Sequence, residues 1–160
     1  MRRSQNVLAG RAMLLALVAS SLVLPAPALA AGLAAAYCSA GANTSERPLP
    51  AKLAAPAAQA LDADVAVVRT GAYYRCSGGR LLVCAVGANL WCGKADTNTR
   101  PAKVVSYCRN NAEAVLAPMA VTGHATIYAW RCAHGVPEIE PSPMAVDSDG
   151  YIADNWRELE

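Results

Sequence analysis

The sequence predicts a small, mainly β domain, an antiparallel meander or barrel-like fold stapled by disulfides, with one short α-helix. Three observations lead to this fold class. Six cysteines are distributed along the 160-residue chain. Residues 72–86 hold two apolar, β-rich runs around Ser77-Gly78-Gly79, which is the pattern of a β-hairpin. Pro101 opens a stretch with the apolar spacing of a helix.

Residues 1–30 have the three parts of a secretory signal peptide and are set aside from the fold. The start is basic, residues 13–24 are apolar, and Ala28-Leu29-Ala30 is a small-x-small cleavage site. The apolar run of about a dozen residues is shorter than the roughly 20 that a membrane-spanning helix needs. A retained anchor is the alternative. We expect a periplasmic or extracellular protein with no membrane span after cleavage.

Removal of this leader changes the charge balance. The chain has 14 basic and 12 acidic residues, and Arg2, Arg3 and Arg11 lie in the leader, so 11 basic residues remain against 12 acids. This balance argues against nucleic acid or an anionic membrane as a partner, because such binding needs a dense positive surface. Basic residues concentrate in residues 69–109 and acidic ones in residues 138–160. Either the acidic tail folds over the basic meander, or one of these surfaces faces a charged partner.

All six cysteines follow the leader. An even number in a small exported protein predicts three disulfides formed in an oxidising compartment. The six are Cys38, Cys76, Cys84, Cys92, Cys108 and Cys132. Because the five cysteines after residue 70 cannot pair completely among themselves, we expect Cys38 to bond to the folded part.

Residues 31–61 are dominated by Ala and Pro and predict an extended, mobile arm with one short helix near residues 51–60. The disulfide-stabilised β-rich domain is then expected to span residues 62–160. It starts with a strand-like pattern at Val65, Val67 and Val68.

The register of the hairpin sorts the cysteines by face. With a two-residue turn at Gly78-Gly79, Cys76 and Cys84 fall on opposite faces of the ribbon, because directly opposed residues share a face and neighbours alternate. These two should not pair. The next loop, residues 87–89, places Cys92 opposite Cys84, near the roughly 5.5 Å Cα separation of a disulfide. We predict a Cys84–Cys92 bond, and the order of the other two bonds stays open.

The second half of the chain predicts fewer elements. Residues 101–110 have the pattern of a helix, and residues 125–132 have that of a strand. On this strand Tyr128, Trp130 and Cys132 alternate onto one face, which we expect to be core, because aromatic side chains beside a disulfide usually pack on it. The acidic tail then contains a turn and a closing segment.

Catalytic groups are scarce. His124 and His134 are the two histidines, each lies next to glycine in a segment typical of a turn, and no nucleophile motif accompanies them. Zinc-type ligand spacing is missing, and residues 147–150 fit a turn better than a calcium loop, which would need an acid at its twelfth position. We predict no catalytic residue, no metal and no cofactor.

The hairpin at Tyr74-Arg75-Cys76, the meander through Gly87-Ala88-Asn89-Leu90, and the segments Thr122-Gly123-His124 and Trp130-Arg131-Cys132 carry a resemblance. Over roughly residues 70–157 the chain resembles small cysteine-rich exported proteins of proteobacteria. This resemblance implies a compartment and not an activity. The hairpin alone is similar to the opening of periplasmic inhibitors of C-type lysozyme, which use a small disulfide-bearing β-barrel. Their later inhibitory motif has no counterpart here.

These observations favour an exported non-enzymatic binding protein of the bacterial envelope, which recognises a protein or an envelope component. The candidate binding residues are Arg75 and Arg80 near one turn, Asn89 at the other turn, and His124. One alternative is a small envelope hydrolase that uses His124 with an acid of the tail. Another is an accessory subunit of a periplasmic redox complex, which a free cysteine would favour.

Overall fold

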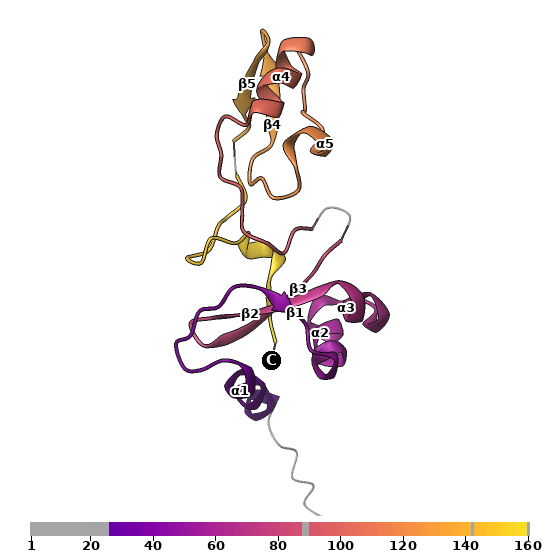
Figure 1. Ribbon diagram of the computed structural model, residues 1–160, viewed down its shortest axis with the longest axis vertical. Coiled ribbons are helices and arrows are strands. Elements are labelled where there is room, and N and C mark those ends of the chain that lie inside the picture. Colours follow the sequence, from indigo (N-terminus) through magenta and orange to yellow (C-terminus); the bar gives the residue numbers. More distant parts are fainter. Residues whose placement is uncertain (1–25, 88–89, 142, 160) are drawn as a thin grey trace, which may run out of the picture.

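The computed structural model describes residues 26–87, 90–141 and 143–159 (Figure 1). Most of the predicted signal peptide, residues 1–25, therefore lies outside the described residues. The first described element is α1 (Ala26–Tyr37), which contains the predicted cleavage site after Ala30. Among the described helices, none is both long and apolar enough to cross a membrane.

The chain forms two antiparallel sheets, joined by short helices. The first sheet has the strand order β1 (Arg47–Pro48), β2 (Ala72–Ser77), β3 (Arg80–Ala85) and β6 (Arg157–Glu158). The second sheet is a hairpin of β4 (Trp130–Ala133) and β5 (Val136–Ile139). The helices after α1 are α2 (Ala54–Leu61), α3 (Val65–Gly71), α4 (Ala102–Asn110) and α5 (Met119–Thr122), and 3-10 turns occur at η1 (Ala51–Leu53) and η2 (Ala153–Asn155). The predicted fold class, a small, mainly β domain with disulfides and a short helix, is confirmed.

The β2–β3 hairpin has the predicted register. Cys76 lies opposite Leu81, and the turn is formed by Gly78 and Gly79, whose φ angles are 60° and 81°. Both values fall in the left-handed region that glycine adopts without steric cost. A Cβ atom on Gly79 would also lie 2.8 Å from the backbone nitrogen of Gly41, so the turn requires glycine for space as well as for conformation.

The two faces of this hairpin are buried by different parts of the chain. Leu81 and Val83 face α2 and α3, which cover one side of the sheet. Leu82 and Cys84 alternate with them onto the other side, where they pack with Tyr151 from the C-terminal segment. Figure 1 shows this segment passing between the two sheets before it joins the first as β6. The tail therefore supplies the second layer of the sheet.

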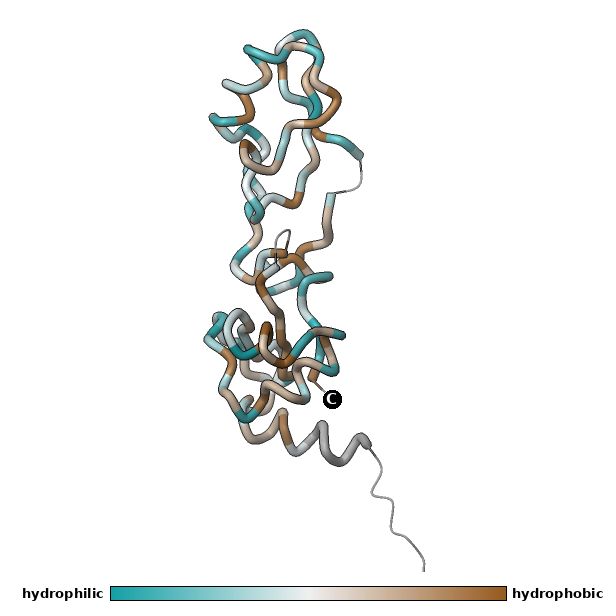
Figure 2. The backbone as a smooth tube through the Cα atoms, turned by 90° about the vertical axis from the view of Figure 1, so that its right-hand side faces the viewer, coloured by the Kyte–Doolittle hydropathy of each residue, from teal (hydrophilic) through white to brown (hydrophobic). Residues whose placement is uncertain are grey.

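A separate apolar cluster holds the second sheet. Val104 and Cys108 of α4 pack on Trp130 and Cys132 of β4. The apolar segments of this part lie apart from those of the first sheet, as the hydropathy colouring of Figure 2 shows. Tyr128 packs edge-on against Trp130, with ring centroids 5.8 Å apart, so the predicted core role of this aromatic face is confirmed.

Each apolar cluster contains one disulfide. The three bonds join Cys38 with Cys76, Cys84 with Cys92, and Cys108 with Cys132. The predicted Cys84–Cys92 bond is thereby confirmed, with a Cα separation of 5.8 Å. The expectation that Cys38 bonds to the folded part is confirmed too, and its partner is Cys76 of the hairpin. Because the three disulfide loops follow one another without overlap, each cross-link stabilises its own cluster.

Residues 31–61 differ from the predicted extended arm. The short helix predicted near residues 51–60 is present as η1 and α2. The segment is nevertheless packed and not extended, because Leu53, Ala54 and Ala57 are buried in the core of the first sheet. The alanine-rich composition hid this role, because small side chains allow α2 to pack closely on β3 without producing a strong apolar periodicity. The predicted domain start at residue 62 thus lies inside a packed cluster.

Two predicted strands also have a different structure. Val65, Val67 and Val68 belong to helix α3, because the side chain of Asp64 caps its start by accepting a hydrogen bond from the amide of Ala66 (2.6 Å). This cap and the burial of Val68 outweigh the β propensity of valine. The strand predicted over residues 125–132 is shortened to β4, and its first half forms the loop described next.

Candidate functional site

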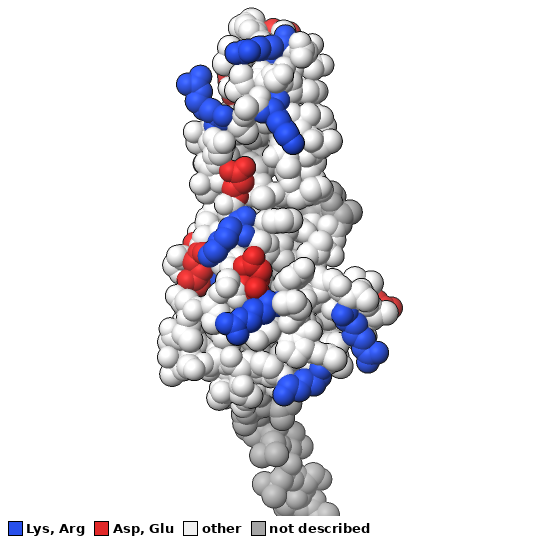
Figure 3. Space-filling model, viewed as in Figure 1, with Lys and Arg blue, Asp and Glu red and all other residues white. Residues whose placement is uncertain are grey.

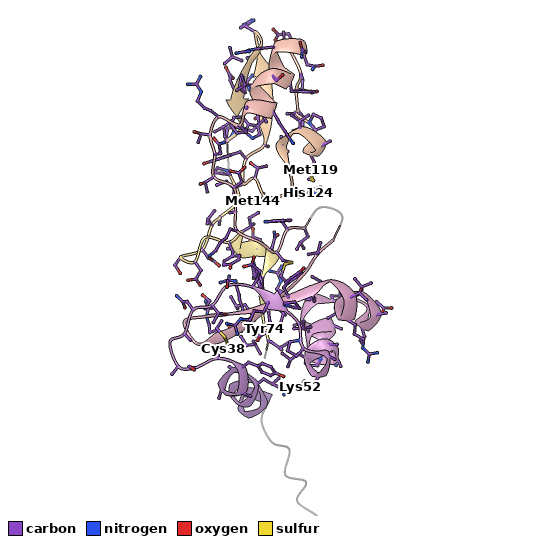
Figure 4. The ribbon with its side chains drawn as sticks, in the orientation of Figure 1. Cys38, Lys52, Tyr74, Met119, His124 and Met144 are labelled. Carbon is purple, nitrogen blue, oxygen red and sulfur yellow. A yellow bond between two sulfur atoms is a disulfide. The ribbon has the colours of Figure 1, made fainter. Side chains whose placement is uncertain are left out.

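A groove of about 420 Å³ lies beside α5, between this helix and the loop that follows it. The segment after β5 contributes one further residue, Met144. Figure 4 shows Met119, His124 and Met144 near one another in this part of the molecule. The lining side chains are Leu116, Ala117, Met119, Thr122, Gly123, His124, Thr126, Ile127, Tyr128, Ala129 and Met144.

Backbone hydrogen bonds hold the segments of the groove together. The amide of Gly123 donates to the carbonyl of Met119 (2.8 Å) and closes α5. Gly123 has a φ angle of 84°, so the chain turns sharply into His124 at a conformation that favours glycine. The amide of Met144 donates to the carbonyl of Ile127 (2.9 Å), which fastens the later segment to the groove wall. The groove is thus assembled from two stretches of chain.

The lining of the groove is mainly apolar and open to solvent. Leu116, Met119 and Met144 are 60%, 40% and 43% exposed. The polar groups are the hydroxyls of two threonines and Tyr128 and the exposed imidazole of His124. Among the described residues that line the groove, none is Asp, Glu, Lys or Arg. The site can therefore accept an apolar group or a soft ligand, but it offers no counter-charge.

The arrangement around His124 does not form the pair that a hydrolase needs. Asp147 and Asp149, two of the tail acids that could serve it, both bind Arg75 instead. Within the described part of the chain, His124 makes no hydrogen bond or ion pair with these acids or with Asp154. Without a carboxylate to orient it, the imidazole lacks the partner that tunes a general base.

Arg75, predicted as an exposed binding residue, is completely buried (0% exposed). Its guanidinium pairs with Asp147 and, at 3.0 Å, with Asp149. The same group lies over the rings of Tyr151 and Trp156, at 4.3 Å and 4.6 Å from the centroids. The prediction was wrong because the strand alternation points Arg75 to the face that the tail covers. Arg75 fastens the tail to the hairpin and does not offer a binding surface.

This cluster perturbs two acidic groups. Burial acts to raise the pKa of Asp147, but the backbone hydrogen bond from Tyr151 and the charge of Arg75 outweigh it, and the pKa lies below its ordinary value of 3.8. Burial, together with the hydrogen bond to the carboxylate of Glu46, raises the pKa of Tyr151 to about 12. The two pKa shifts favour an ionised Asp147, which accepts the hydrogen bonds of the cluster, and a neutral Tyr151, which donates one to Glu46.

The other predicted binding residues have different fates. Arg80 is exposed and pairs with Glu158 at 3.5 Å. Asn89 lies outside the described residues. His124 lines the groove. Arg75 is buried, Arg80 pairs with the tail, and only His124 lines the groove. The described candidate residues therefore do not form one site.

The ion pairs decide between the two interpretations of the charge distribution. Arg75 and Arg80 of the basic meander both pair with acids of the tail, so the tail folds over the meander. On the face shown in Figure 3, basic and acidic side chains lie among each other and neither forms a continuous patch. The ion pairs therefore favour the first interpretation, in which the tail covers the meander.

Sequence reasoning missed Met119 and Met144. Of the four methionines of the chain, Met1 and Met13 lie in the predicted leader, so these are the two that follow it. They lie 25 positions apart in the sequence, and only the fold brings them to one groove. In the sequence, the only hint to these two residues is that they are the only methionines after the predicted leader.

The described residues contain no group of three or more His, Cys, Asp or Glu side chains that could hold a metal ion. Every cysteine is in a disulfide.

No protein-family model, curated protein or solved structure matches this chain.

Proposed function

We propose that this chain is an exported, non-enzymatic binding protein of the bacterial envelope, which recognises a partner protein through the groove beside α5. The observation that carries the proposal is the exposed apolar lining of that groove. Leu116 and Met144 keep 60% and 43% of their surface in water, and the adjacent Val115 keeps 88%. Contiguous apolar surface with a polar rim is typical of interaction sites.

The lining also indicates the chemistry of the partner. The groove presents thioether and aliphatic groups and a few hydroxyls, and the described lining contains no Asp, Glu, Lys or Arg. Burying such groups against an apolar side chain stabilises a complex by about 25 cal/mol per Å². An apolar segment of another envelope protein therefore fits the groove better than a charged glycan or an acidic peptide.

Export is supported by two features. The leader-like pattern of residues 1–30 predicts secretion, and three disulfides fit an oxidising compartment. Cross-linking also leaves the groove on a rigid scaffold, which lowers the entropic cost of binding.

The proposal is tested by affinity capture from envelope extracts with quantitative mass spectrometry. The variant Leu116→Asp places a charge on the rim of the groove. Val67→Asp is the matched control, because Val67 is 52% exposed and lies on α3 in the other cluster. We expect a specific partner to be captured by the unchanged chain and by Val67→Asp, and to be lost with Leu116→Asp.

Three results would contradict the proposal. The first is capture that Leu116→Asp leaves unchanged, and the second is the absence of any specific partner. The third is turnover of an envelope substrate that His124→Ala abolishes, which would support the hydrolase alternative. The redox-subunit alternative has no support in the described residues, where all six cysteines are bonded.

A further inference from the structure

We propose that the groove binds one Cu(I) ion, ligated by the thioethers of Met119 and Met144 and by the imidazole of His124. This inference goes beyond recognition of a protein partner and does not depend on it, because the isolated chain would bind the metal. It rests on where the fold places these three side chains and on their chemistry.

The juxtaposition uses both methionines that remain after the predicted leader. The chain has four methionines and two histidines in all. Met119 and Met144 come from separate stretches of chain, yet both line the groove with His124 (Figure 4). The two stretches are fastened by the hydrogen bond from the amide of Met144 to the carbonyl of Ile127 (2.9 Å). The fold therefore brings the three side chains to one groove from two separate stretches of chain.

The exposure of the two methionines does not fit a role in packing. A methionine that fills a core is buried, whereas Met119 and Met144 are 40% and 43% exposed and face an open groove. His124 is exposed too, and in the described chain no hydrogen bond or ion pair occupies its ring. His134 differs, because its ring lies 3.3 Å from the carboxylate of Glu113. Of the two imidazoles, the one in the groove is available as a ligand.

The donor set selects the metal. Thioethers are soft ligands that prefer Cu(I), and imidazole also binds copper well. Zn²⁺ prefers thiolate, imidazole and carboxylate, and the described lining has one imidazole and no carboxylate. Because all six cysteines are in disulfides, no thiolate in the described chain competes for the ion. Two sulfurs and one nitrogen give a three-coordinate site for a monovalent soft cation.

The test is a competition titration of the purified, disulfide-intact chain with Cu(I) and a chromophoric Cu(I) chelator, with ascorbate keeping the copper reduced. We expect the chain to withdraw one equivalent of Cu(I). Loss of even an outer-shell partner lowers metal affinity about 10–100-fold, so Met119→Leu, Met144→Leu and His124→Ala should each weaken binding about tenfold or more. His134→Ala is the matched control and should bind as the unchanged chain does. Excess Zn²⁺ should not displace the copper.

A second measurement uses the unchanged chain, so it does not depend on whether a variant folds. With the redox-inert analogue Ag(I), the methionine ε-methyl NMR signals of Met119 and Met144 should shift together, and they should saturate at one equivalent. The proposal is overturned if the chain withdraws no copper, if the methyl signals stay in place, or if the three variants bind like His134→Ala. A missing protein partner would leave this result unaffected, so the two proposals fail separately.

Discussion

The substitution Arg75→Met tests whether the buried arginine fastens the tail to the hairpin. Methionine keeps most of the length and apolar volume of the arginine stem, so packing between Tyr151 and Trp156 is largely retained. The change removes the charge that faces Asp147 and Asp149. Two carboxylates then remain close together without a counter-ion, in a site that the tail covers.

The expected cost follows from burial. Removing one partner of a buried ion pair costs about 3–5 kcal/mol, because the other charge remains buried and unpaired. The side chain of Arg75 is 1% exposed, but those of Asp147 and Asp149 are 21% and 11% exposed, so water reaches them in part. We therefore expect the free energy of unfolding to fall by about 3 kcal/mol. This is a large share of the about 5–15 kcal/mol that stabilises a typical domain.

Urea unfolding at neutral pH, followed by tryptophan fluorescence and circular dichroism with the disulfides intact, measures this loss. Arg80→Met is the control, because Arg80 lies beside the turn of the same hairpin. Its ion pair with Glu158 joins side chains that are 58% and 45% exposed, and such surface pairs contribute about 0–1 kcal/mol. If Arg75→Met is no more destabilising than Arg80→Met, the assignment of Arg75 as the fastening residue is refuted.

Three further predictions concern stability. Replacing Cys38 and Cys76 together with alanine opens a loop of 38 residues and should lower the free energy of unfolding by about 4 kcal/mol, measured by urea unfolding; a change under about 1 kcal/mol would contradict the structural role of this bond. Because the pKa of Asp147 is lowered, this residue contributes fully to the free energy of unfolding above pH 3.8, and the contribution is lost as the pH falls through its folded pKa. The contribution of Tyr151 is complete below pH 10.0 and is lost as the pH rises through about 12. Thermal melts across both pH ranges check these signs, and a melting temperature that does not fall at the acid end would argue against the role given to Asp147. Gly79→Ala should cost about 1–3 kcal/mol because φ must stay positive, and a melting temperature equal to that of the unchanged chain would show that the turn tolerates a Cβ.

The hairpin was predictable because its information is local. Gly78-Gly79 fixes the turn, and the turn fixes the register of the two strands. This register places Cys76 and Cys84 on opposite faces, so they bond to other cysteines and not to each other. The helix after Pro101 was predictable for the same reason, since proline at the start and apolar spacing act within a few residues. Each of these elements is specified by neighbours in sequence.

The rest depends on contacts between distant segments. Nothing near Arg75 in sequence announces that Asp147 and Asp149 will cover it, and the side chains involved are separated by more than 70 residues. The helix α3 is set by the Asp64 cap and by burial of Val68 against residues of the expected arm. The groove likewise exists only once the segment that carries Met144 is hydrogen-bonded to Ile127.

Site-specific photo-cross-linking in living cells tests directly whether the groove beside α5 binds a partner protein. A photo-reactive amino acid replaces Leu116 on the groove or, as the control, Val67 on α3. We predict a single defined cross-linked product from position 116 and none from position 67. Products from position 67 alone, or none from position 116, would contradict the claim that the groove beside α5 is where this protein binds its partner.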